Sequence, residues 1–249
     1  MIDPPAYLAR IGYSGSTSPN SDTLRSLQRS HMLAVPFENL DISAGRVIIC
    51  HESRFLHKIV NERRGGFCYE LNGAFAALLR ALGFQTTLLS ARVPRGPSDG
   101  PEFDHLALRV DLEEPWLVDV GFGDSFLEPL RLISEVEQEQ EVGKFRIHSK
   151  AGDTFVMQRF NAEKDWRAQY SFTLKPRALS DFAGMCHYHQ TSPESHFTQK
   201  RICSLATADG RITLSDLTLL VTRNGKREER VLTESERNTV LRERFGVSL

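Results

Sequence analysis

The sequence predicts an α+β protein in which a helical region, a β region and a small α/β region follow one another. Apolar residues recur at helical spacing through residues 1–83, and short strand-like runs follow over residues 84–185. A hairpin signal and a last helix then occupy residues 186–249. We therefore expect three domains with these boundaries: a helical bundle, a β domain and an α/β domain.

Three helices are predicted in the first region. Asp3 followed by Pro4 is a typical helix start, because the aspartate caps the free N–H groups and proline fits the first turn. Asp22 opens a second helix that ends before Pro36. The clearest helix begins at Cys68. Its apolar stripe consists of Phe67, Leu71, Phe75, Leu78 and Leu82, and Gly83 is placed to cap the end.

The β region contains runs that read as strands at 86–93, 105–111, 116–120, 144–148, 154–160 and 169–174. Strands at such regular spacing are typical of a small barrel or sandwich. The acidic, glutamine-rich stretch 135–141 is expected to be a solvated loop or a short helix.

The last region contains a hairpin signal. The runs 217–222 and 226–232 flank Asn224-Gly225, a pair that favours the positive φ angles of a tight turn. Thr233 with Glu236 forms a capping box for a helix that ends by Gly246.

Composition narrows the function classes. The net charge of −1 and the pI near 6.7 argue against nucleic acid as the main partner, which requires a surplus of Lys and Arg. No apolar run has the length of a signal peptide or of a bilayer span. The cysteines at 50, 68, 186 and 203 form no Cys-x-x-Cys pair, so reduced thiols and a cytoplasmic location are expected.

Cys68 is the candidate nucleophile. A thiol in the first turn of a helix lies in the field of unpaired backbone N–H groups, which favours the thiolate. Gly65-Gly66 provides a flexible turn that allows close backbone approach just before it. The alternative is that Cys68 is a small core hydrophobe. Position on the helix alone leaves the two interpretations about equal.

His105 and Asp119 are the candidate partners of this thiol. Asp119 ends an apolar strand, where a carboxylate is costly to bury without a hydrogen bond, and an imidazole N–H would provide one. A Cys–His–Asp relay would satisfy both groups. In the alternative interpretation, Asp119 is a turn former and His105 a surface residue. Spacing alone favours this alternative slightly.

The other cysteines and histidines give weaker signals. Cys50-His51 and Cys186-His187 are adjacent pairs, and chain neighbours do not face each other in a strand or a helix. Cys203 lies in an apolar stretch and is expected in the core. The histidines at 187, 189 and 196 lack a fourth ligand and a recognised spacing, so we expect a polar loop there and no metal site.

Four segments resemble signatures of the arylamine N-acetyltransferases, and they occur in the family's order. They are Arg64-Gly65-Gly66-Phe67-Cys68-Tyr69-Glu70 with Asn72 and Gly73, Val35 to Asp41 (VPFENLD), Val118 to Gly123 (VDVGFG), and Ser192 to Phe197 (SPESHF). Any one of them is moderate evidence. The set, reaching from the first helices into the last region, is hard to obtain by chance.

The resemblance implies a helical bundle, a β-barrel and an α/β lid around a papain- or transglutaminase-like cysteine core. It also implies a Cys68–His105–Asp119 triad and ping-pong transfer of an acetyl group from acetyl-coenzyme A to arylamines, arylhydroxylamines or hydrazines. No permanently bound cofactor is implied. The chain is expected to act as a monomer or homodimer.

The resemblance extends to binding and support residues. It places Phe37, Tyr69, Val93, Phe122 and Phe197 around an aromatic acceptor, although each is also a plausible core residue. Gly121 and Gly123 would let coenzyme A approach the backbone, although glycines after a strand are also ordinary turns. Glu38 and Arg64 are expected to form an ion pair that supports the Cys68 loop. The chain stops three residues after Gly246, which puts in doubt any contacts made by a longer carboxy-terminal tail.

Other functions remain open at this point. The same residue types would serve an amide synthase, or a thiol hydrolase or transglutaminase-like enzyme. The Gly-x-Cys-Trp surroundings usual in the transglutaminase-like class are absent, because Tyr69-Glu70 follows Cys68. A relative that only binds a ligand is a further alternative, against which the intact triad counts.

Overall fold

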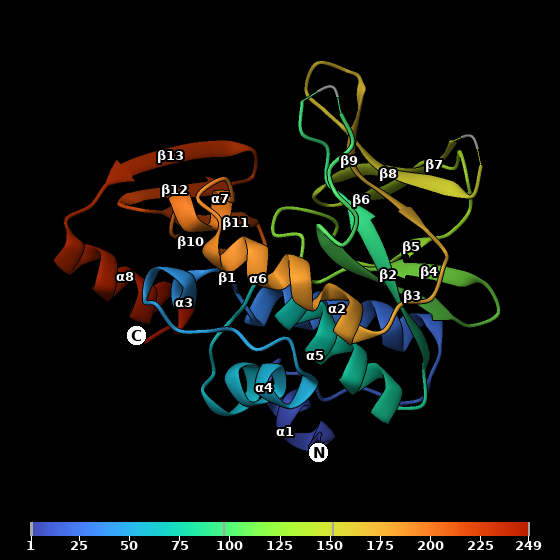
Figure 1. The fold of residues 1–249 in the computed structure, drawn as a ribbon, viewed down its shortest axis with the longest axis horizontal. Coiled ribbons are helices and arrows are strands. Elements are labelled where there is room, and N and C mark those ends of the chain that lie inside the picture. The colour runs from blue at the N-terminus through green and yellow to red at the C-terminus, as the bar shows by residue number, and fades with distance from the viewer. Residues whose placement is uncertain (1, 97, 151, 249) are drawn as a thin grey trace.

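The computed structural model describes residues 2–96, 98–150 and 152–248. It confirms the mixture of helices and sheets (Figure 1). A group of helices from the first third of the chain lies beneath a large, strongly curved sheet, and the last strands and helix form a smaller layer beside them. The residue boundaries predicted for the three domains stay a prediction.

The three predicted helices of the first region are present as α1, α2 and α5, and two short helices, α3 and α4, were not predicted. Their bounds are α1 (Pro4–Arg10), α2 (Ser21–Ala34), α3 (Leu40–Ser43), α4 (Glu52–Leu56) and α5 (Cys68–Ala81), with a π-helical turn at His57–Asn61. Asp3 caps α1 as predicted, through a bond from the Ala6 N–H. The helix α2 begins at Ser21, one residue before the predicted start at Asp22, because the Asn20 side chain caps it by accepting the Thr23 N–H.

The helix α5 begins at Cys68 as predicted and is buried almost all round, with twelve of its fourteen residues buried. A helix that is apolar on every side belongs in a core. It packs against strands β2 and β3 on one side and α4 on the other. Gly83 follows its end with a φ of +91°, a left-handed conformation that favours glycine.

In the described part of the chain, eight strands form the curved sheet in the order β5-β4-β3-β2-β9-β8-β7-β6. Their bounds are β2 (Gln85–Arg92), β3 (His105–Asp111), β4 (Pro115–Val118), β5 (Leu130–Arg131), β6 (Gln138–Gln140), β7 (Gly143–Lys150), β8 (Thr154–Phe160) and β9 (Trp166–Thr173). The predicted strands at 105–111 and 154–160 match β3 and β8. Of the two predicted architectures, barrel and sandwich, this is a barrel that is nearly closed.

The prediction of a solvated loop or helix at 135–141 was wrong, because this stretch contains β6. The side chain of Gln138 accepts the Arg131 N–H at 2.8 Å and donates to the Arg131 carbonyl at 3.0 Å. Gln140 makes the same kind of contact with the backbone of residues 127 and 128. These amides act as a substitute for backbone pairing between β5 and β6, the two edges of the barrel.

The second sheet has the order β1-β10-β11-β12-β13 among the described strands. Its members are β1 (Phe37–Glu38), β10 (Ile202–Thr207), β11 (Gly210–Ser215), β12 (Thr218–Arg223) and β13 (Lys226–Val231), and α8 (Glu234–Phe245) packs on it. The predicted hairpin is confirmed, and both Asn224 and Gly225 have positive φ. The capping box of Thr233 and Glu236 is also present.

Two features connect the helical region with the last part of the chain. Strand β1 comes from the first region but pairs with β10, so Phe37 lies opposite Ser204. Helices α6 (Ala183–Thr191) and α7 (His196–Gln199) lie between the small sheet and the barrel in Figure 1. Both connections bring distant segments close to the first turn of α5.

Candidate active site

Cys68 lies in the first turn of α5 at a point where the chain is tightly packed. A side chain on Gly65 would come within 2.0 Å of the Pro36 carbonyl oxygen, and one on Gly66 within 2.7 Å of Glu70. The glycine pair is therefore required by close packing. It allows the segment before the helix to lie against β1, where the Glu38 N–H donates to the Gly66 carbonyl at 2.8 Å.

His105 and Asp119 come from adjacent strands of the barrel and meet behind Cys68. His105 is the first residue of β3, and Asp119 directly follows β4. The His105 Nε2 lies 2.8 Å from Asp119 Oδ2, and both side chains are buried. The other carboxylate oxygen, Oδ1, accepts the Asn72 amide and the Gly121 N–H, each at 2.8 Å. Both oxygens of the Asp119 carboxylate therefore accept hydrogen bonds, although it lies at the end of an apolar strand.

The electrostatics of this pair favour an imidazolium. Burial by itself would lower the pKa of His105, but the charge and hydrogen bond of Asp119, together with the Cys68 thiol, outweigh it and raise the pKa to about 10. Burial by itself would raise the pKa of Asp119, yet His105, Asn72 and Gly121 bring it below its usual value. Because Nε2 faces Asp119, the second ring nitrogen, Nδ1, is left for Cys68.

A cavity of about 290 Å³ opens onto these residues. Cys68, His105 and Gly121 line it, and its other walls include four of the five predicted acceptor residues, namely Phe37, Val93, Phe122 and Phe197. A larger hollow of about 630 Å³ lies between the barrel and the small sheet, but it contains none of the three triad candidates. The apolar walls and the thiol make the smaller cavity the candidate active site.

Tyr69 is the exception among the predicted acceptor residues. It does not line the cavity, because it is fully buried and its hydroxyl donates to the Phe103 carbonyl at 2.7 Å. Adjacent helix positions are rotated by about 100°, so the residue after Cys68 points away from the cavity. Tyr69 instead packs edge-on against Phe67.

Gly121 and Gly123 have structural reasons to be glycine, and the approach of coenzyme A to them stays a prediction. A side chain on Gly121 would come within 2.8 Å of the Cys68 Cα and 2.7 Å of the Asn72 amide nitrogen. The close approach is therefore to α5 itself. Gly123 has a φ of +93°, which favours glycine, and it does not line the active-site cavity.

Sequence reasoning missed four polar residues in the cavity wall: Arg95, Asp104, His189 and His196. The expected polar loop around the histidines is instead the helices α6 and α7. His189 Nε2 lies 3.2 Å from Asp104 Oδ1, and Arg95 donates to the same oxygen at 2.9 Å. Burial would raise the pKa of Asp104, but these two partners lower it. The one sequence feature that pointed to any of these four residues was the Ser192–Phe197 segment, which contains His196.

The remaining cysteines lie outside the active-site cavity. Cys50 donates to the Leu179 carbonyl, and Cys186 is buried on α6. Cys203 is buried in the core of the small sheet as predicted, and burial raises its pKa well above the usual value. Among the described residues, no group of three or more His, Cys, Asp or Glu side chains is arranged to hold a metal ion.

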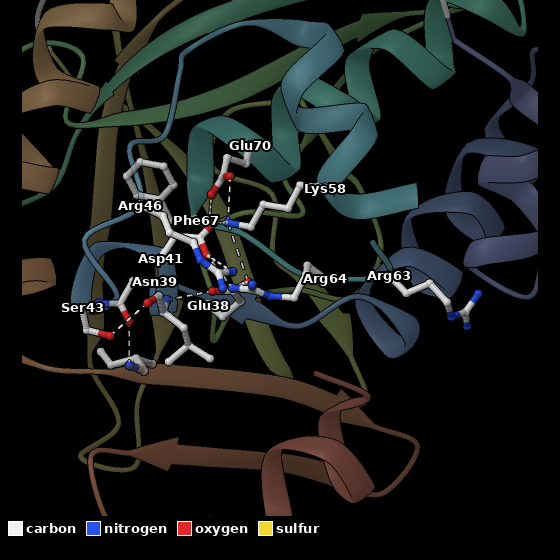
Figure 2. A network of polar contacts seen from close by, with 12 residues as sticks. Glu38, Asn39, Asp41, Ser43, Arg46, Lys58, Arg63, Arg64, Phe67 and Glu70 are labelled. Carbon is white, nitrogen blue, oxygen red and sulfur yellow. Dashed lines mark hydrogen bonds and ion pairs between the residues drawn. The ribbon is translucent and has the colours of Figure 1, made fainter. Parts of the chain in front are cut away.

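Glu38 and Arg64 lie side by side on the other side of α5's first turn. The Arg64 Nη2 is 2.8 Å from Glu38 Oε1, and Nε donates to the same oxygen at 3.0 Å. Both side chains are buried and belong to a larger group of charges (Figure 2).

Known proteins match this chain over nearly its whole length. The sequence profile of the N-acetyltransferase family matches residues 20–249. The chain belongs to the arylamine N-acetyltransferase family. The arylamine N-acetyltransferase of Escherichia coli (strain K12) is 36% identical, with 98% of this chain and 88% of that protein aligned.

No described helix is long and apolar enough to cross a membrane.

Solved structures agree with the sequence relatives. The arylamine N-acetyltransferase of Mycobacterium marinum superposes with a TM-score of 0.92 at 32% identity, covering 98% of this chain and 93% of that one. The structure of the M. marinum enzyme in complex with CoA gives a TM-score of 0.91 at 33% identity, with the same coverage. Relatives of the family thus share both the order of elements and the fold around α5.

Proposed function

We propose that the chain transfers an acetyl group from acetyl-coenzyme A to the nitrogen of arylamines, arylhydroxylamines or hydrazines, through a thioester on Cys68. The observation that carries this proposal is the cavity in which Cys68 and His105 meet, with Asp119 bonded behind the imidazole. The names of its relatives and the CoA complex of one of them support the donor and acceptor.

In the first half of the reaction, the Cys68 thiolate attacks the thioester carbonyl of acetyl-coenzyme A. A pKa of about 10 for His105 keeps the imidazole protonated at neutral pH, and the imidazolium provides the counter-charge for the thiolate. When the tetrahedral intermediate collapses, His105 gives its Nδ1 proton to the departing coenzyme A sulfur. The acetyl group then remains on Cys68, and His105 is neutral.

In the second half, the amine nitrogen attacks the Cys68 thioester and gives a proton to the neutral His105. The collapse releases the acetylated amine and restores the thiolate–imidazolium pair. Asp119 fixes the tautomer of His105 and stabilises its charged form. The Cys68 N–H, free at the start of α5, is a candidate donor to the intermediate's oxyanion.

The walls of the cavity support an aromatic acceptor. Phe37 and Phe197 lie with ring centroids 6.1 Å apart, and Phe122 meets the His105 ring edge-on at 5.3 Å. Such a slot would hold a flat ring beside the thioester. The four free thiols fit a reducing compartment, and we place the enzyme in the cytoplasm.

The decisive experiment is an intact-mass measurement after incubation with acetyl-coenzyme A and no acceptor. We expect one added acetyl group, which disappears when an arylamine is supplied and is absent in Cys68→Ser. An unmodified mass, or an acetyl group that survives Cys68→Ser, would refute the mechanism.

The same preparation separates transfer from hydrolysis. Release of coenzyme A should be slow with water alone and fast with an aromatic amine or hydrazine, and initial rates should follow a ping-pong pattern. Rapid turnover with water alone would favour a thiol hydrolase instead.

A further inference from the structure

Behind α5, on the side away from the cavity, five charged side chains form a buried network. They are Glu38, Asp41, Lys58, Arg64 and Glu70, each at most 8% exposed. Figure 2 shows Lys58 reaching in between Glu70 and the carboxylates of β1 and α3, while Arg63, the neighbour of Arg64, points away. The described network thus holds three carboxylates and two cations.

Lys58 is the centre of this network. Its Nζ lies 2.8 Å from Asp41 Oδ2, 2.9 Å from Glu70 Oε1 and 3.7 Å from Glu38 Oε1. The first two contacts have hydrogen-bond length, and the third is a longer ion pair. Lys58 therefore ties three separate segments of the chain to one point.

Glu70 connects this point to the turn that carries the nucleophile. Its second oxygen, Oε2, accepts the Phe67 N–H at 3.1 Å. Phe67 is the residue before α5 and has no side-chain oxygen to cap the helix. Glu70 is thus the side chain that holds this turn, as in one half of a capping box. Residues two apart lie on nearly opposite faces of a helix, so Glu70 holds the turn from behind while Cys68 faces the cavity.

Stability alone does not account for such a network. Replacing a buried ion pair by apolar residues of similar size is often neutral or stabilising, because the charges lose their hydration. What apolar residues cannot provide is a fixed acceptor for the Phe67 N–H. The position of the turn, and with it the Cys68 sulfur, is what the network supplies.

We propose that Glu70 is a positioning residue for Cys68: a side-chain oxygen, held in place by Lys58, accepts the Phe67 N–H and fixes the turn from which the thiol reaches the substrate. This inference rests on the proposed role of Cys68 as the nucleophile. A misplacement of about 1 Å at a reacting atom can cost about 100-fold in rate.

Two double variants test the proposal, because they differ only in the acceptor. Lys58→Met with Glu70→Gln removes the ion pair but keeps a side-chain oxygen for the Phe67 N–H. Lys58→Met with Glu70→Met removes both. The measurements are the single-turnover rate of Cys68 acetylation, the rate of Cys68 alkylation by iodoacetamide, and the melting temperature. The control is Glu62→Gln, an exposed change in a surface hollow that Lys58 and Glu70 also line.

We expect the Met/Gln pair to acetylate within a few-fold of the parent. The Met/Met pair should acetylate about 10- to 100-fold more slowly than the parent, with a melting temperature similar to that of the Met/Gln pair. Alkylation should follow the same order. A folded Met/Met protein that acetylates at the parent rate would overturn the proposal, as would equal losses in both pairs. Should Met/Met not fold, Lys58→Gln with Glu70→Met removes the same acceptor and is judged by the same rates.

Failure of the proposed function is separable from failure of this inference. If the parent takes up no acetyl group on Cys68, the proposed function fails, whereas the alkylation rates still compare the position of the thiol among the variants. If the parent is acetylated and the two pairs do not differ, the positioning role fails alone.

Discussion

Two groups of buried charges flank the first turn of α5, and they differ in how completely their bonds are satisfied. In the network behind the helix, Lys58 and Arg64 each contact more than one carboxylate. In the pair on the cavity side, Asp119 is fully bonded, but the His105 ring keeps one nitrogen toward Cys68. Burial is similar in both groups, so burial does not distinguish chemistry from support.

Both groups contain side chains with perturbed pKa values, so such values alone do not identify the catalytic group. The pKa of Glu70 is raised to about 7, chiefly by burial and against the pull of Lys58, and that of His105 is raised to about 10. Strong shifts occur in structural networks as well as in active sites. The open cavity at Cys68 and the free ring nitrogen are what assign chemistry to the His105 side.

The largest effect is expected from Asp119→Asn. Asparagine keeps the size of the side chain but can present an amide N–H to the imidazole, which would force the wrong tautomer and remove the counter-charge. Acetyl transfer should fall on the order of 10⁴-fold, as when a triad Asp is replaced in serine enzymes. Thiol alkylation at neutral pH should also slow. Rates are compared on protein whose melting curve shows it folded, and parent rates in both assays would make Asp119 a turn residue.

Arg64→Gln should act mainly on stability, which would distinguish the network behind α5 from the His105–Asp119 pair. Removing this cation leaves Glu38, which is fully buried, with Lys58 at 3.7 Å as its remaining charged partner. Breaking a buried pair in this way typically costs about 3–5 kcal/mol, so both the melting temperature and the activity should fall. The matched control is Arg63→Gln, whose exposed side chain points away from the network (Figure 2). Lost activity at normal melting temperature would move Arg64 into the catalytic site.

The sequence predicts most of the cavity side of α5 and little of the network. The strict three- and four-residue spacing after Phe67 locates the helix, and the apolar strands locate His105 and Asp119 at strand ends. Lys58, in contrast, has no special pattern around it. Its burial depends on carboxylates from β1, α3 and α5. Contacts between segments that lie far apart in the sequence cannot be predicted from local sequence patterns.

Elements held by side chains were missed for a similar reason. Strand β6 is three residues long and its glutamine amides replace backbone partners, so composition indicated a solvated stretch. Strand β1 has two residues, too few for any alternation to show. Tyr69 was misplaced because the signature gives its identity, whereas the helical rotation decides which way it points.

The last effect is on melting temperature and not on rate: the stability of the two groups should depend on pH in different ranges. The pKa of His105 is raised from 6.5 to about 10, so the folded protein binds this proton more tightly than the unfolded chain. Its stabilisation is complete below pH 6.5 and is lost as the pH rises to about 10. The pKa of Glu70 is raised from 4.5 to about 7, so ionisation of this carboxyl lowers stability between these values. Asp119→Asn should flatten the upper range, and Lys58→Met with Glu70→Gln should flatten the lower range and leave the upper range as in the parent. Melting curves from pH 4.5 to 10 test this, and a Lys58→Met, Glu70→Gln protein that flattens the upper range would show that the two groups titrate as one.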